Sequence, residues 1–173
     1  MGSRRPVIGI LALVAACGGR SSWDGAVYRS GPVAFRMAAR VPAGWQQISV
    51  DRASLAYRDD PHDASVLVNA RCGAKDGDAP LLALTNHLLM GTTGREVIAE
   101  ETLPFDAREA LHTRLSAKLD GVPRSFDIFV LKKDGCVYDF VFVAPPDQVG
   151  LGAPAFEEFV RGFHTLPGSG DPT

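Results

Sequence analysis

The chain has 173 residues, of which 46% are hydrophobic and 22% are charged. This is ordinary globular composition, and the length suits one domain better than two. Its 18 basic and 20 acidic residues give a formal charge of −2, so there is no broad basic surface for a phosphate backbone. The sequence therefore predicts a single folded domain that does not bind nucleic acid.

The first 16 residues have the pattern of an export signal. Arg4 and Arg5 precede an uncharged run from Val7 to Ala16 that ends in small residues, as at a signal-peptide cleavage site. The run is shorter than the roughly 20 apolar residues that span a bilayer. A plain secreted protein and a short uncleaved anchor are the alternatives, and the stretch from Ser3 to Ile8 partly resembles a twin-arginine export signal.

The stretch VAAC, Val14 to Cys17, resembles the lipobox of bacterial lipoproteins, whose usual form is Leu, two small residues and Cys. The resemblance implies that residues 1–16 are removed and that Cys17 carries a diacylglyceryl thioether and an acylated amino group, which together anchor a protein stably. Gly18 follows the cysteine where enterobacterial inner-membrane retention requires Asp. We therefore expect a periplasm-facing lipoprotein of the cell membrane or the outer membrane, with the outer membrane as the default.

Loss of the leader leaves 16 basic and 20 acidic residues, a charge of −4. A mildly acidic protein has little general attraction for anionic lipids, so the lipid is expected to provide the anchoring. Residues 17–30 are expected to form the lipidated cysteine and a flexible tether, because they are mainly small and polar. One α+β domain is expected at residues 31–166, followed by a disordered tail at 167–173.

The first strand of this domain is predicted from Val33 to Met37, where larger apolar residues alternate with Ala and Arg. A turn, PAGW, follows it, and Trp45 is expected in the core. Two short strands, LAYR from Leu55 and ASVLVNARC from Ala64, then flank an acidic loop. Four possible metal ligands lie in this loop: Asp59, Asp60, His62 and Asp63. Their spacing lacks the regular alternation and the glycine of a calcium loop, so we expect a solvated turn and no metal site.

Two helices are predicted. The first is expected to be capped by Asp78, to have Pro80 in its first turn and to end at Gly91. Its apolar face consists of Leu81, Leu84 and Leu88. The second, PAFEEFVRGF from Pro154 to Phe163, is apolar at positions i, i+3, i+4 and i+7.

Between the helices, the sequence from Arg95 onward predicts a meander of long antiparallel strands. Apolar and polar residues alternate from Leu111 to Leu119, which gives one buried and one polar face. Asp120-Gly121 and Asp134-Gly135 are hairpin signals. With two-residue turns, four cross-strand pairs follow: Leu115 with Phe126, Arg114 with Asp127, Phe129 with Phe140, and Ile128 with Val141. Both faces of the inner strands are apolar and need a cover, which the two helices can provide.

Cys72 ends one predicted strand and Cys136 begins another. In an exported protein such a pair is a natural disulfide, and closing a loop of about 60 residues stabilises a fold by roughly 4 kcal/mol on the chain-entropy model. The alternative is two buried, reduced thiols in strands that never meet.

A search for catalytic motifs finds little. The four histidines, His62, His87, His112 and His164, are scattered, and the sequence contains no HExxH, CxxC or Gly-x-Ser-x-Gly motif. We therefore expect no enzyme, no catalytic residues and no cofactor.

The strand leading into VPAGW, the short strands, the helix, the meander and the closing FEEFVRGF helix together resemble the α/β/α sandwich of the PsbP and DcrB-type lipoprotein group, over most of Val33 to Leu166. The resemblance implies an α+β fold with an antiparallel sheet of about six to seven strands covered by two helices. It also implies a non-catalytic protein-binding or accessory module of a membrane complex.

Two other functions compete with this one. A carrier or sensor of a small apolar ligand would require an enclosed pocket between sheet and helix. A hydrolase would require a cleft in which a Ser or His lies beside a carboxylate, for instance around His112.

Overall fold

A computed structural model describes residues 21–37, 40–73 and 78–168 of the chain. The leader, the lipobox with Cys17 and the tail from residue 169 lie outside the described residues, so their predicted roles stay predictions. Among the described residues, no helix is long and apolar enough to cross a bilayer.

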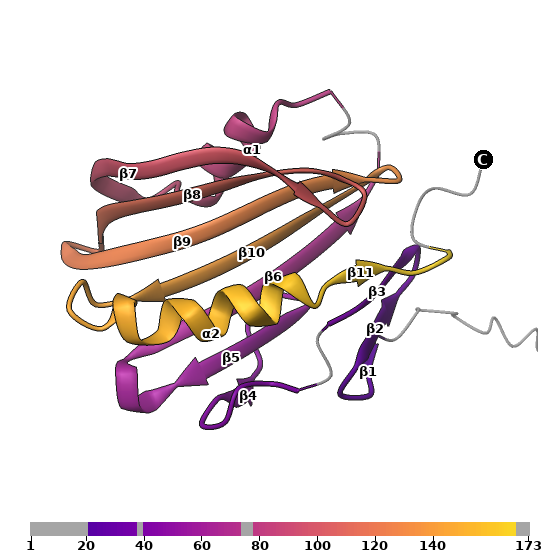
Figure 1. Ribbon diagram of the computed structural model, residues 1–173, viewed down its shortest axis with the longest axis horizontal. Coiled ribbons are helices and arrows are strands. Elements are labelled where there is room, and N and C mark those ends of the chain that lie inside the picture. Colours follow the sequence, from indigo (N-terminus) through magenta and orange to yellow (C-terminus); the bar gives the residue numbers. More distant parts are fainter. Residues whose placement is uncertain (1–20, 38–39, 74–77, 169–173) are drawn as a thin grey trace, which may run out of the picture.

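A seven-stranded antiparallel sheet forms the centre of the molecule (Figure 1), with the strand order β4-β5-β6-β10-β9-β8-β7. Its strands are β4 (Gln46–Ile48), β5 (Leu55–Asp59), β6 (Ala64–Cys72), β7 (Thr92–Phe105), β8 (Arg108–Leu119), β9 (Val122–Lys133) and β10 (Cys136–Ala144). The last four strands are the predicted meander. The sheet is completed by the pairing of β10 with β6, an earlier part of the chain.

The two predicted hairpin turns are confirmed. Asp120 and Gly121 have φ angles of 50° and 80°, and Asp134 and Gly135 have φ angles of 51° and 72°, so both residues of each turn are left-handed, as a tight two-residue turn requires. All four predicted cross-strand pairs are present in the register. Correct turn geometry therefore produces the predicted register of β8 with β9 and of β9 with β10.

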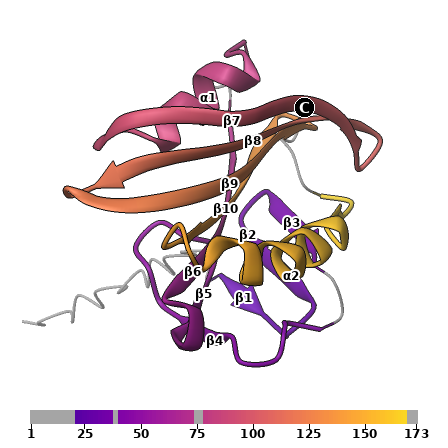
Figure 2. The same ribbon diagram turned by 60° about the vertical axis from the view of Figure 1, so that its left-hand side comes forward.

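The two helices cover opposite faces of the sheet, so the molecule is an α/β/α sandwich (Figure 2). Helix α1 (Leu81–Leu88) packs against β8 and β9, and α2 (Val149–Arg161) packs against β6, β9 and β10. The predicted Asp78 cap is wrong, because Pro80 occupies the N-cap position and no side chain caps the helix.

Helix α2 begins five residues before the predicted start, so that Pro154 lies inside it. Gly152 is buried, and Val149 and Ala153 pack against the core. Packing of this first turn outweighs the loss of one helical hydrogen bond at the proline.

A second, four-stranded sheet has the order β1-β2-β3-β11. Its strands are β1 (Ser22–Trp23), β2 (Val27–Ser30), β3 (Val33–Arg36) and β11 (His164–Thr165). The expectation of a flexible tether up to residue 30 is therefore wrong from Ser22 onward. Its two aromatic residues explain the difference: Tyr28 stacks on Phe35 with ring centroids 5.0 Å apart, and Trp23 packs against the core.

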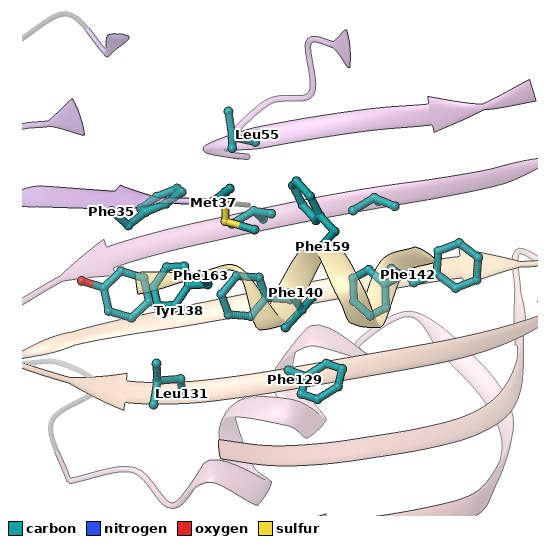
Figure 3. Close-up of a cluster of buried hydrophobic side chains, with 14 of the residues drawn as sticks. Phe35, Met37, Leu55, Phe129, Leu131, Tyr138, Phe140, Phe142, Phe159 and Phe163 are labelled. Carbon is teal, nitrogen blue, oxygen red and sulfur yellow. The ribbon is translucent and has the colours of Figure 1, made fainter. Parts of the chain in front are cut away.

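The larger apolar cluster fills the space between the sheet, α2 and the small sheet, and aromatic rings dominate it (Figure 3). Its rings include Phe35, Phe129, Tyr138, Phe140, Phe142, Phe159 and Phe163. Trp45, predicted to be a core residue, packs against this cluster with its ring 5.5 Å from that of Phe159. A smaller cluster lies on the other face and joins Leu84 of α1 to Leu115, Phe126 and Ile128.

Candidate functional site

A groove of about 460 Å³ lies where α2 leaves part of β7 and β8 uncovered. Its apolar wall is formed by Leu103, Pro104, Phe105 and Phe129. Its charged rim is formed by Glu101, Arg114, Glu157 and Arg161. The sequence does not predict this groove, because the charges of its rim come from three separate elements.

His112 lines this groove and is buried. Its ring stacks on Phe129, with centroids 3.9 Å apart and planes inclined by 7°. Its Nε2 lies 2.7 Å from Oδ1 of Asp127, whose side chain is 1% exposed, and its Nδ1 lies 3.5 Å from Oε1 of Glu101. The imidazole is thus held between an aromatic ring and two carboxylates.

Strand register explains this contact. His112 lies directly opposite Phe129, so Asp127 is its diagonal neighbour on the same face of the sheet. Arg114 lies opposite Asp127 as predicted, yet among the described contacts the carboxylate of Asp127 bonds to His112 and not to Arg114. The imidazole fits into the interior, whereas the arginine stays at the exposed rim.

A buried His–Asp pair provides two of the three groups of a nucleophilic triad. Within the described residues, no hydrogen bond joins His112 to a serine, threonine or cysteine. The second carboxylate oxygen of Asp127, Oδ2, is buried without a hydrogen-bond partner among those residues. The arrangement can therefore orient the imidazole beside a groove, and the described residues that line this groove include no serine, threonine or cysteine.

The acidic loop that holds Asp59, Asp60, His62 and Asp63 forms a short 3-10 helix, η1 (Asp60–His62). Arg58 bonds to Asp60 and Asp63, Arg124 Nη1 lies 2.6 Å from Asp63 Oδ2, and His62 Nδ1 lies 2.7 Å from Asp59 Oδ2. Hydrogen bonds from Arg58 and Arg124 lower the pKa of Asp63. The carboxylates of this loop thus serve as ion-pair partners. The described part of the chain contains no group of three or more His, Cys, Asp or Glu residues that could hold a metal ion.

Cys72 and Cys136 are joined by a disulfide, as predicted. They lie directly opposite each other at one end of the β6–β10 ladder. The bond thus links the two strands whose pairing completes the sheet.

Asp106, in the β7–β8 turn, connects this hairpin to the end of the domain. Its carboxylate accepts hydrogen bonds from the amide and hydroxyl of Thr165, both at 2.9 Å, from Lys133 Nζ at 2.9 Å and from His164 Nδ1 at 3.1 Å. Burial alone would raise the pKa of Asp106, but these donors outweigh it and lower the pKa to about 2. His164 is therefore a partner in a structural junction.

Strand β7 forms one edge of the large sheet, so one side of its backbone has no neighbouring strand among the described residues. Val97 and Ile98 are 61% and 69% exposed, at a register shift in the β7–β8 pairing. We call this outer side, with Val97 and Ile98, the β7 edge. Two further large apolar side chains are exposed on or just after the adjacent helix α1, Leu82 and Met90.

No protein-family model matches the chain, and no curated protein matches it in sequence. Solved structures resemble it over most of its length. Cyanobacterial PsbP (CyanoP) from Synechocystis sp. PCC 6803 has a TM-score of 0.56 at 15% identity, covering 92% of this chain and 99% of CyanoP.

Two further solved structures show the same likeness. LpqN, described as involved in cell envelope biogenesis of Mycobacterium tuberculosis, has a TM-score of 0.55 at 16% identity, covering 79% of this chain and 86% of LpqN. The Saccharomyces cerevisiae Ran-binding protein Mog1p has a TM-score of 0.53 at 14% identity, covering 84% and 95%. At such identities the likeness defines the fold, and the predicted PsbP-like α+β sandwich is confirmed.

Proposed function

We propose that this protein is an envelope lipoprotein, anchored through Cys17, whose PsbP-like domain is a non-catalytic module that binds a protein partner through the β7 edge. The observation that carries the proposal is the pair of exposed aliphatic side chains, Val97 and Ile98, on the outer strand of the sheet. An unpaired strand edge can accept an extended segment of another chain through its backbone groups.

The position of the β7 edge supports this role. In both views of the molecule, β7 lies on the side opposite to β1, where the described chain begins (Figures 1 and 2). A partner that approaches β7 is therefore not obstructed by the membrane-proximal end of the domain.

The charges of β7 indicate what kind of segment fits. Glu96, Glu100 and Glu101 are exposed on this strand, against the single basic residue Arg95. A matching partner segment carries aliphatic side chains for Val97 and Ile98, together with basic residues for the carboxylates.

Site-specific photocrosslinking in native membranes tests the proposal. A photoreactive amino acid at Ile98 should crosslink a discrete partner, and the same amino acid at Lys118, an exposed position on β8, should not. The combined variant Val97→Ser/Glu96→Lys should weaken capture of that partner, because it removes an aliphatic contact and replaces a carboxylate by a charge that repels a basic segment. Its unfolding temperature should stay within a few degrees of wild type, because both side chains are exposed. Equal crosslinking from the two positions, or none from Ile98, contradicts the proposal.

The lipid anchor has its own test. Cells fed radiolabelled palmitate should label the wild-type protein and the Cys72→Ala/Cys136→Ala variant, but not Cys17→Ala. The Cys17→Ala variant should also leave the membrane fraction. A labelled, membrane-bound Cys17→Ala variant would falsify the anchor assignment.

The groove beside His112 favours one alternative, a carrier of a small ligand, because its volume of about 460 Å³ lies in the range of small-molecule sites. Native mass spectrometry of protein purified from its own membranes should then show a bound molecule that is lost in Arg114→Ala. If the mass equals that of the lipidated chain alone, the alternative fails.

A further inference from the structure

The small sheet packs one face against the core, and its other face is partly exposed. On this second face Ser22, Arg29, Arg36 and His164 are exposed, Val27 is half-buried and Ala34 is buried. Strand register places Trp23, Tyr28 and Phe35 on the core side. The other side carries Ser22, Val27, Arg29, Ala34, Arg36 and His164. We call this second side the outer face of the small sheet.

The outer face is basic, although the chain as a whole is acidic. Arg29 and Arg36 are exposed, and no carboxylate of the described residues forms an ion pair with either of them. The face has two acidic neighbours. Asp24, in the β1–β2 turn, accepts hydrogen bonds from the amides of Val27 and Ala26, and these bonds together with the smaller effect of the Arg29 charge lower the pKa of its carboxyl. Asp106 is held by Lys133 and Thr165 beside His164.

The distance from the anchor to this sheet is short. Since β1 begins at Ser22, five residue steps separate it from Cys17, and even a fully extended chain spans at most about 18 Å over that length. The connecting segment Gly18 to Ser21 contains Arg20 and no acidic residue. The short connection keeps the small sheet near the surface that holds the lipid.

We propose that the outer face of the small sheet lies against the anionic phospholipid headgroups of the leaflet that holds the anchor. The inference rests on the proposed lipid attachment at Cys17. Arg29 and Arg36 supply the charge complementarity, and each basic residue near such a surface changes partitioning by about fivefold. Strand β7 meets the small sheet at its turn into β8, through Asp106 and His164. The rest of the strand runs away from this face, so on this orientation most of the β7 edge lies away from the bilayer (Figures 1 and 2).

Quenching of a tryptophan on the outer face by a nitroxide on lipid headgroups tests this orientation. Trp23 and Trp45 are the two tryptophans of the chain, and Trp23 packs against the core. The reporter is therefore the lipidated chain with Trp23→Phe, Trp45→Phe and Ser22→Trp, whose single tryptophan lies at an exposed position of the outer face. It is reconstituted into vesicles of phosphatidylcholine, or of phosphatidylcholine with about 30 mol% phosphatidylglycerol. We expect strong quenching on the anionic vesicles, about twofold weaker quenching on the neutral ones, and a loss of the difference at high salt.

Charge reversal provides the matched comparison. Arg29→Glu/Arg36→Glu should reduce quenching on anionic vesicles to the neutral-vesicle level, whereas Arg52→Glu/Lys118→Glu, an equal charge change on other exposed positions, should leave it unchanged. Unfolding curves check that both variants fold.

Two results overturn the inference in distinguishable ways. If mass spectrometry shows no lipid on Cys17, the proposed anchor fails and the inference fails with it. If Cys17 is lipidated but quenching is the same on both kinds of vesicle, or unaffected by the Arg29 and Arg36 changes, the anchor stands and the orientation is wrong.

Discussion

At the scale of single residues, a short polar contact in the interior joins His112 to Asp127. The Asp127 carboxylate is almost fully buried, and His112 Nε2 is its one hydrogen-bond partner among the described contacts. Removing only the partner of a buried carboxylate destabilises a fold much more than replacing both members of the pair by apolar residues. The contact therefore contributes to stability whether or not the groove binds a ligand.

Replacement of His112 by Phe should lower the free energy of unfolding by about 3–5 kcal/mol, because Asp127 is left buried and unpaired. In the double variant His112→Phe/Asp127→Leu much of this loss should be recovered, and the double-mutant cycle measures the coupling. Urea unfolding of the variants is the measurement, with Arg114→Ala as the exposed control. A loss no greater than that of Arg114→Ala would mean that the two side chains do not interact.

Asp106 makes stability depend on pH in a defined window. Its pKa of about 2 in the folded chain lies below the ordinary value of 3.8, so the ionised carboxylate stabilises the fold above about pH 4, and this contribution is lost as the pH falls from 4 towards 2. Asp106→Asn should lower the free energy of unfolding at pH 7 by about 1 kcal/mol, after allowance for solvent screening. It should also reduce the dependence of that free energy on pH below pH 4. Urea midpoints between pH 2 and 7 test this. The control variant Asp51→Asn, in an exposed loop, should show the same dependence of stability on pH as the wild type. If Asp51→Asn reduces this dependence as much as Asp106→Asn does, Asp106 is not its cause.

At the scale of elements, the start of α2 depends on the close approach of its backbone to the sheet. A Cβ atom added at Gly152 would lie 2.5 Å from Cζ of Phe142, whose ring is fully buried, whereas one added at Gly150 would meet nothing within 4 Å. Glycine at the first of these positions is therefore required by packing.

Alanine substitutions at these two glycines should have opposite effects. Gly152→Ala should destabilise the protein by about 1–3 kcal/mol through overpacking against Phe142. Gly150→Ala should stabilise it by up to about 1 kcal/mol, because alanine loses less conformational freedom in a helix than glycine. Thermal unfolding of the two variants is the measurement. A Gly152→Ala variant more stable than the wild type would show that the helix can shift away from the sheet.

The long hairpins are the part of the fold that sequence predicts best. Asp120-Gly121 and Asp134-Gly135 each determine a turn type, and period-two alternation then assigns every following side chain to a face. The start of α2 at Val149 and the strands that hold Trp23 and Tyr28 are not predictable in this way. Their short, mixed segments acquire structure from packing against Phe142 and Phe35.

The candidate site is less predictable than the fold. His112 lies on the face predicted to be polar and yet is buried, because Phe129 and the groove under α2 provide cover that comes from distant parts of the chain. Once the hairpin register is known, Asp127 is the diagonal neighbour of His112, and this relation could have predicted their contact. The Asp106 junction has no such signal, because Thr165 is 59 residues away.

Removal of the disulfide tests the link between β6 and β10. The Cys72→Ala/Cys136→Ala variant lacks this bond, which joins two residues 64 positions apart in the sequence. Its free energy of unfolding should be lower than that of the wild type by up to about 4 kcal/mol. Urea unfolding with and without reductant is the measurement. Reductant should destabilise the wild type and leave the double variant unchanged; an effect on both would point to another cause.

At the scale of the whole molecule, the described domain has two different ends. The small sheet with Arg29 and Arg36 lies at the end where the chain enters, and β7 with Val97 and Ile98 forms the opposite side. On our two proposals, one end faces lipid and the other faces a protein partner. Lengthening the segment between Cys17 and Ser22 with a flexible linker should then release the small sheet from the bilayer without affecting capture through β7.

The pairing of β6 with β10 has a consequence for the order in which the molecule assembles. Strands β7 to β10 are neighbours in sequence and can pair through local turns, whereas β6 gains its partner β10 across a much longer loop, which is slower to close. Cys72 and Cys136 come into contact when β6 pairs with β10. Their oxidation to a disulfide is therefore expected only after these two strands have paired. During refolding, the thiols of Cys72 and Cys136 should become protected from alkylation only after the β8–β9 amides become protected from hydrogen exchange. Formation of this disulfide would then report that the sheet is complete.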